Sequence, residues 1–206
     1  MPSPDAHTSS VIWVARKEDV PLVREGEEQA KLLAATLRNV HIRPTAVYCG
    51  PLLRTRRFAS VILEQIGLSY APINDERLAE IDYGAWGGLT NEEILARYGA
   101  DQFLAWQRES RWPAGAAWQP SEDAVLEGVH SLVKDIVNKH DDGDSINLVS
   151  SNGILRYFLK LVPGMFEQQL HASEVKVATG RACLISYERA KFHISCWNKD
   201  PRVAFV

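Results

Sequence analysis

The sequence is short of cysteine and contains no long apolar run. Its three cysteines are Cys49, Cys183 and Cys196, and no two of them form a Cys-x-x-Cys pair. An odd, sparse set of this kind argues against a disulfide framework and favours reduced thiols and a cytoplasmic location. The apolar runs fall well below the ~18 residues of a membrane-spanning helix, so no membrane association is expected. The start of the chain lacks the basic and apolar stretches of a secretory signal, and we expect a flexible tail over residues 1–9.

The sequence also has no large excess of positive or negative charge. The chain has 23 Lys and Arg against 26 Asp and Glu, a formal net charge of −3. A broad, sequence-independent hold on nucleic acid is therefore not expected. Apolar residues make up 46% of the 206 residues, which excludes a disordered chain. No two histidines have the spacing of metal ligands, so we expect neither a metal nor another cofactor.

Short apolar runs alternate with segments of helical periodicity. Runs rich in β-branched residues predict buried strands at 11–15, 46–49 and 146–149, and two later strands are expected around 182–188 and 193–197. Helices are predicted at about 26–40, 51–66, 90–98, 121–137 and 153–161. This alternation predicts one α/β domain over residues 1–206, a three-layer sandwich with a mostly parallel central sheet flanked by helices.

Residues 99–120 interrupt the alternation with tryptophans, prolines and glycines that follow no period. We interpret this Trp-rich segment as a partly irregular excursion above the ends of the strands. Its large aromatic side chains, Trp106, Trp112 and Trp118, are open to two interpretations. They either cover the core or form an exposed surface for a protein partner or for self-association.

Three segments at or after predicted strands resemble motifs of the histidine phosphatase superfamily, the phosphoglycerate-mutase-like fold. Gly50–Arg56, GPLLRTR, is similar to that family's Ser-Pro-Leu-x-Arg-Ala segment. Arg77–Leu89, RLAEIDYGAWGGL, is similar to Leu-x-Glu-x-x-Phe/Tyr-Gly-x-Trp-Glu-Gly-Leu. Leu148–Arg156, LVSSNGILR, is similar to Val-Ser-His-Gly-Gly-x-x-Arg. Order and spacing agree over about residues 11–200, which supports the fold class proposed above.

The resemblance implies a phosphate pocket made of two histidines and two arginines. In the family one histidine, in an Arg-His-Gly motif after the first strand, attacks phosphorus, and a carboxylate protonates the leaving group. Position by position, Arg54 matches the second phosphate arginine and Glu80 matches the proton donor. Arginine suits this task because its planar guanidinium binds two phosphate oxygens at once.

The chain departs from the family pattern at both histidines. The first motif is replaced by Val-Ala-Arg-Lys-Glu, so either Arg16 or, with a shift of one, Lys17 stands in the place of the nucleophile. Ser151, followed by Asn152, stands in the place of the second histidine. A guanidinium is always protonated and cannot attack phosphorus. The loop that leads to the segment Pro21–Ala30 is also much shorter than in the family.

These losses predict a catalytically degenerate relative, a pseudophosphatase, that binds a protein partner or an anionic, phosphorylated ligand in a relic phosphate pocket. Its relic catalytic positions are Arg16, Lys17, Glu80 and Ser151, none of which we assign as catalytic. Its candidate anion-binding residues are Arg16, Arg54, Glu80, Ser151 and Asn152. We expect both arginines to share one site, with Glu80 paired to one of them. The alternative is a weak or atypical phosphatase or phosphomutase, or other chemistry in a rebuilt pocket.

Overall fold

The computed structural model describes residues 12–14, 16, 17 and 19–205. Its helices are α1 (Arg24–Asn39), α2 (Leu53–Ile66), α3 (Asn91–Tyr98), α4 (Ala100–Glu109), α5 (Glu122–Lys139), α6 (Asn152–Leu155), α7 (Met165–His171) and α8 (Pro201–Ala204). Its strands are β1 (Ala46–Cys49), β2 (Ile73–Asn74), β3 (Ile146–Val149), β4 (Ala182–Glu188) and β5 (Lys191–Lys199). Three 3-10 turns lie at Glu76–Leu78, Gly84–Trp86 and Arg156–Leu161.

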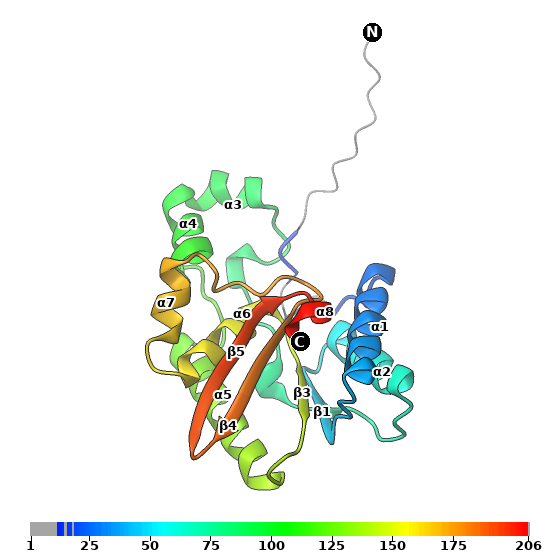
Figure 1. Cartoon of the computed structure of the whole chain (residues 1–206). Helices are drawn as coiled ribbons and strands as arrows, with labels where there is room; N and C mark the ends of the chain where they lie inside the picture. The colour runs from blue at the N-terminus through cyan, green and yellow to red at the C-terminus, as the bar shows by residue number, and fades with distance from the viewer. Residues whose placement is uncertain (1–11, 15, 18, 206) are drawn as a thin grey trace.

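The strands form two sheets. β2, β1 and β3 lie in that order and are parallel, with Ala46 opposite Ile146 and Cys49 opposite Val149. β4 and β5 form an antiparallel hairpin, which Figure 1 shows in front of the α5 side of the molecule. The carboxyl ends of β1 and β3 therefore meet at one edge of the parallel sheet, and the family-like segments follow them there.

β1 is buried on both faces, as its unalternated apolar sequence predicts. Val47 and Cys49 pack against Ala59 and Leu63 of α2. The alternate residues of β1 belong to the larger core cluster, to which α5 contributes. Figure 1 shows α1 and α2 together on one side of the strands. The α/β class, with a parallel sheet between helical layers, is confirmed.

Capping residues in the sequence predicted several helix ends correctly. Thr90 and Glu93 form a reciprocal capping box at the start of α3. The Ser121 hydroxyl accepts the Ala124 N–H at the start of α5. Gly67 follows α2 with a φ of 78°, a conformation that favours glycine at a helix end. Each of these capping interactions involves residues only a few positions apart, so the helix end can be predicted from the sequence alone.

The strand expected at 11–15 is wrong for its described residues. Trp13 donates its N–H to the Leu89 carbonyl and accepts from the Gly88 N–H, both at 2.9 Å, while Ile12 bridges Thr90. The remaining residues of that prediction, 11 and 15, lie outside the described residues. Residues 12–14 lie along a loop because the indole of Trp13 packs edge-on against other aromatic rings there. Among the described strands, β3 pairs with β1 alone.

The Trp-rich segment is more regular than expected, because α4 occupies Ala100–Glu109. Trp106 and Trp118 are only 2% and 5% exposed, and their rings meet edge-on with centroids 4.7 Å apart. Trp112 is half-buried and donates its Nε1–H to the Tyr157 hydroxyl. These rings cover the core and do not form an exposed tryptophan surface. A protein partner or self-association at residues 99–120 stays a prediction. Residues 153–161 also differ from the single expected helix, since α6 ends at Leu155 and a 3-10 turn follows.

Candidate functional site

A buried carboxylate lies beside the carboxyl edge of the parallel sheet. Glu80 is 7% exposed, its Oε1 accepts the Ile81 N–H at 2.9 Å, and it is hydrogen-bonded to the Tyr83 hydroxyl. The first turn of α6 approaches it closely. A Cβ at Gly153 would lie 2.2 Å from Glu80 Oε1 and 2.8 Å from the Tyr83 hydroxyl. A glycine is therefore required for α6 to approach the carboxylate.

Two arginines place positive charge on this carboxylate. Arg54 lies in the first turn of α2 and Arg156 follows α6, and both act electrostatically on Glu80. Arg156 is 3% exposed, and its Nη1 donates to Ser110 Oγ at 2.9 Å. Its guanidinium also lies 3.8 Å from the ring centroid of Trp106, a cation–π contact. We call Glu80, Tyr83, Arg54 and Arg156 the Glu80 cluster.

Burial dominates the electrostatics of the Glu80 cluster. Removal from water raises the pKa of Glu80, against the lowering effects of its hydrogen bonds and the two arginines. Burial, followed by the charge of Glu80, raises the pKa of Tyr83 well above its usual value. Burial also lowers the pKa of Arg156, although an arginine stays protonated under ordinary conditions. Each charged group of the cluster therefore depends on the opposite charges beside it to offset its loss of hydration.

Arg16 does not join the Glu80 cluster, contrary to the expected shared site. It forms an ion pair with Glu76, and the two side chains are 41% and 69% exposed. Lys17 is 76% exposed and pairs with Asp82 at 2.8 Å. The cause is the path of residues 12–14, which the Trp13 Nε1–H bond to Asn91 Oδ1 ties to the 82–91 loop. Both candidates for the nucleophile position are therefore engaged by acidic side chains outside the cluster.

The residues at the second histidine position have structural contacts. Ser151 precedes α6 and its carbonyl accepts the N–H groups of Ile154 and Leu155, but its hydroxyl caps no helix N–H. Asn152 Oδ1 accepts the Val177 N–H at 2.9 Å, which holds the 177 segment over α6. Asn152 therefore helps to build the site but does not present its amide oxygen to a ligand.

A second carboxylate lies at the amino end of α2. Asp19 Oδ1 accepts the Leu53 N–H at 2.6 Å, next to Arg54 in the same turn. Free N–H groups and the dipole make the start of a helix favourable for negative charge. No motif in the sequence points to Asp19. Arg156 ends the third family-like segment and could have been found from that motif.

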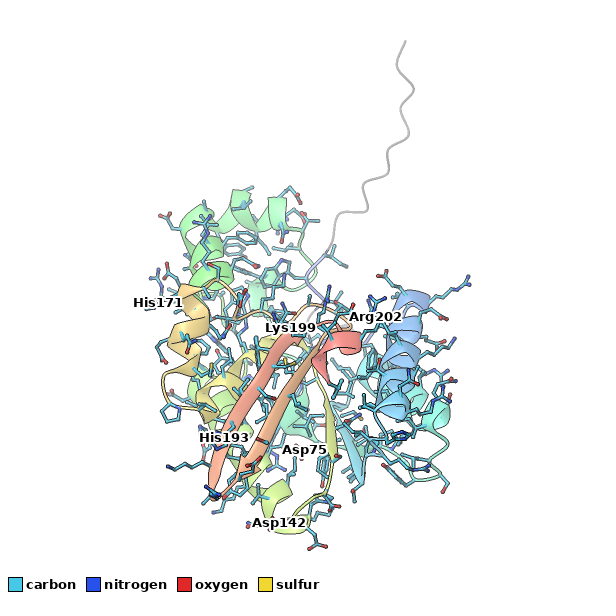
Figure 2. The ribbon with its side chains drawn as sticks, viewed as in Figure 1. Asp75, Asp142, His171, His193, Lys199 and Arg202 are labelled. Atoms are coloured by element: carbon cyan, nitrogen blue, oxygen red, sulfur yellow. The ribbon has the colours of Figure 1, made fainter. Side chains whose placement is uncertain are left out.

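The described histidines lie elsewhere. The ring of His140 lies 3.0 Å from the Tyr48 hydroxyl and 3.7 Å from Asp144, in the turn before β3. Figure 2 shows His171 on α7 and His193 on the β4–β5 hairpin, and both are exposed. Among the charges that act on Glu80 in the described part of the chain, none belongs to a histidine.

Two further findings concern the described residues only. None of their helices combines the length and the apolar character needed to cross a bilayer. None of their histidine, cysteine and acidic side chains gather in groups of three or more that could hold a metal ion.

Comparison with known sequences gives a family match over most of the chain. The profile of the histidine phosphatase superfamily (branch 1) matches residues 7–200. The chain is 35% identical over 111 residues to a 2,3-bisphosphoglycerate-dependent phosphoglycerate mutase of Thermobifida fusca, an alignment covering 53% of this chain and 43% of that enzyme. It is 26% identical over 191 residues to the enzyme of that name from Corynebacterium diphtheriae, covering 82% and 75%. It is 33% identical over 124 residues to phosphoserine phosphatase 1 of Hydrogenobacter thermophilus, covering 59% and 55%.

Solved structures show the same fold. A mycobacterial glucosyl-3-phosphoglycerate phosphatase superposes with a TM-score of 0.74 at 21% identity, covering 91% of this chain and 92% of that one. The α-ribazole phosphatase of Shigella flexneri gives 0.70 at 16% identity, covering 91% and 88%. At these identities the superpositions establish the fold and carry no information about the ligand.

Proposed function

Because this chain belongs to the histidine phosphatase superfamily, we propose that it is a catalytically degenerate member that binds an anionic or phosphorylated ligand at Arg54 and Arg156 without turning it over. The observation that carries the proposal is the composition of the Glu80 cluster. It holds Arg54 and Glu80, which the family resemblance implies, together with Arg156, but a histidine stands at neither motif position.

The missing imidazoles support the loss of turnover. A neutral imidazole is a competent nucleophile near neutral pH, whereas Ser151 is an uncharged hydroxyl with no adjacent base among its described contacts. Arg16 and Lys17 are held by Glu76 and Asp82. Loss of one catalytic nucleophile typically costs many orders of magnitude in rate, and here both histidines are replaced.

The carboxylates support weak, competitive binding of the ligand. Two guanidinium groups near one another need a counter-charge, because an unpaired buried ion costs several kcal/mol. Glu80 supplies that charge from within the chain, and Asp19 accepts from the helix start beside Arg54. An external anion must compete with them. We therefore expect inorganic phosphate to bind with a Kd of ~1 mM, or about −4 kcal/mol.

The first prediction is that no phosphohistidine forms and that an aryl phosphate ester is not hydrolysed above background. The protein would be incubated with a radiolabelled phosphoryl donor, and acid-labile phosphate would be measured beside phosphate release. An active histidine phosphatase in the same assay is the positive control.

The alternative function, a weak or atypical phosphatase or phosphomutase, is supported by the names of the relatives. It predicts the opposite result in the same assay. Acid-labile phosphate on the chain, or turnover that is lost in Lys17→Ala, would establish that alternative and contradict the proposed loss of catalysis.

The second prediction concerns phosphate binding itself. Glu80→Gln removes the competing charge, so we expect it to bind phosphate more tightly than the wild type, while Arg54→Ala binds it more weakly. Thermal-shift titrations with sodium phosphate, matched in ionic strength with sodium chloride, measure both. Equal binding by wild type and Glu80→Gln would refute competition by Glu80. Equal binding by wild type and Arg54→Ala would show that phosphate binds elsewhere.

A further inference from the structure

A second candidate site lies beside the β4–β5 hairpin. It is a cavity of about 590 Å³ between the hairpin, α8 and the segment after α1. Its lining residues are Ile42, Leu184, Ser195, Cys196, Lys199, Val203, Ala204 and Phe205. None of these belongs to the Glu80 cluster. The volume falls within the range of about 300–1,000 Å³ that is usual for small-molecule sites.

The walls of this hairpin cavity are mainly apolar and partly open to solvent. Leu184 and Val203 are 36% and 62% exposed, although both are large aliphatic side chains. They face the same space as Ile42 and Phe205, which come from segments far apart in the sequence. Apolar side chains gathered in an open concavity gain free energy when an apolar group covers them.

One cation faces this apolar cavity. Lys199 ends β5, and Figure 2 shows it at the end of the hairpin beside α8. Within the part of the chain that the structure describes, its ammonium group forms no ion pair. The next residue, Asp200, is engaged by Arg181 at 3.6 Å and Arg202 at 2.8 Å. No carboxylate belongs to the lining residues that the structure describes, and none of them pairs with Lys199.

We propose that the hairpin cavity binds an organic monoanion with an apolar body, of the class of a medium-chain carboxylate. The anionic group pairs with Lys199, and the apolar body covers Leu184 and Val203. Ser195 adds a hydroxyl on the same wall as a hydrogen-bonding group. Cys196 also lines that wall, and its thiol donates to the Ala182 carbonyl at 3.7 Å. This site is independent of the proposed function, since it shares no residue with the Glu80 cluster.

Cys196 makes the proposal testable because its thiol lines the cavity. Alkylation of Cys196 by iodoacetamide would be followed by mass spectrometry with and without octanoate. Octanoate at ten times its Kd should slow alkylation about tenfold, because only the unoccupied fraction reacts. Cys183, which is not a lining residue, is the internal control and should react at an unchanged rate. Octan-1-ol and octylammonium test the need for negative charge and should protect less.

Lys199→Met keeps most of the side-chain volume and removes the charge. We expect it to weaken octanoate binding about tenfold in calorimetric titration and to leave octan-1-ol binding unchanged. Lys191→Met, at the other end of β5 and outside the cavity, is the matched control. The proposal is overturned if octanoate does not protect Cys196 from alkylation, or if octan-1-ol protects it equally. It is also overturned if the protection of Cys196 increases with protein concentration and light scattering shows that a dimer forms.

Discussion

Arg156→Met is expected to lower the free energy of unfolding by about 3–5 kcal/mol at pH 7, the cost of removing one partner from a buried charge cluster. The guanidinium is 3% exposed, donates to Ser110 and stacks on Trp106. Methionine keeps the apolar stem and loses the hydrogen bond to Ser110, the cation–π contact with Trp106 and the attraction to Glu80. For a chain of this length the loss corresponds to a fall in Tm of roughly 10 °C. Denaturant titration followed by tryptophan fluorescence measures it directly.

A double-variant cycle separates charge from packing in this result. If the cost arises mainly because Glu80 loses a counter-charge, then Glu80→Gln introduced into Arg156→Met should restore part of the stability at pH 7. Arg108→Met, at an exposed position of α4, is the matched control and should change stability by less than about 0.5 kcal/mol. Additive effects of the two substitutions would contradict electrostatic coupling between Glu80 and Arg156.

Glu80→Gln is expected to change the pH dependence of stability. Burial raises the pKa of Glu80 in the folded state above its ordinary value of 4.5. The folded state therefore holds this proton more tightly than the unfolded state. Its stabilising contribution is fully present below about pH 4.5 and is lost as pH rises through the folded-state pKa. Each unit of pKa elevation corresponds to about 1.4 kcal/mol.

The measurement compares unfolding free energies of wild type and Glu80→Gln from acidic to neutral pH. The free energy of unfolding of the wild type should fall relative to that of Glu80→Gln as pH rises, because glutamine has no proton to release. Glu92→Gln, an exposed position of α3, is the control and should keep a constant difference from the wild type. A constant difference for Glu80→Gln as well would show that Arg54 and Arg156 fully offset the cost of burying Glu80.

The two halves of the site depend on distant parts of the chain. Glu80 and Tyr83 come from the 76–86 turns, whereas Arg156 and Gly153 come from the segment after β3. The parallel pairing of β1 with β3 brings these segments to one edge. Any change that shifts β3 against β1 should therefore alter the Glu80 cluster before it alters the hairpin cavity.

The sequence by itself determined the local elements and the family. The strands at 46–49 and 146–149 follow from short apolar runs, and the start of α3 follows from the Thr90–Glu93 capping box. The three family-like segments predicted the superfamily because their order and spacing are properties of the chain. The loss of both histidines at the motif positions is likewise visible without coordinates.

Only the tertiary structure decided which charges meet. Arg16 pairs with Glu76, 60 residues away, and the second arginine that acts on Glu80 beside Arg54 is Arg156 rather than Arg16. The apolar run around Trp13 has the composition of a strand, but contacts with Tyr83 and Trp86, about 70 residues later, draw it to a loop. Backbone propensity depends on near neighbours, whereas ion pairs and ring packing depend on groups that folding brings together. For that reason the elements were predictable and the partners of the charged residues were not.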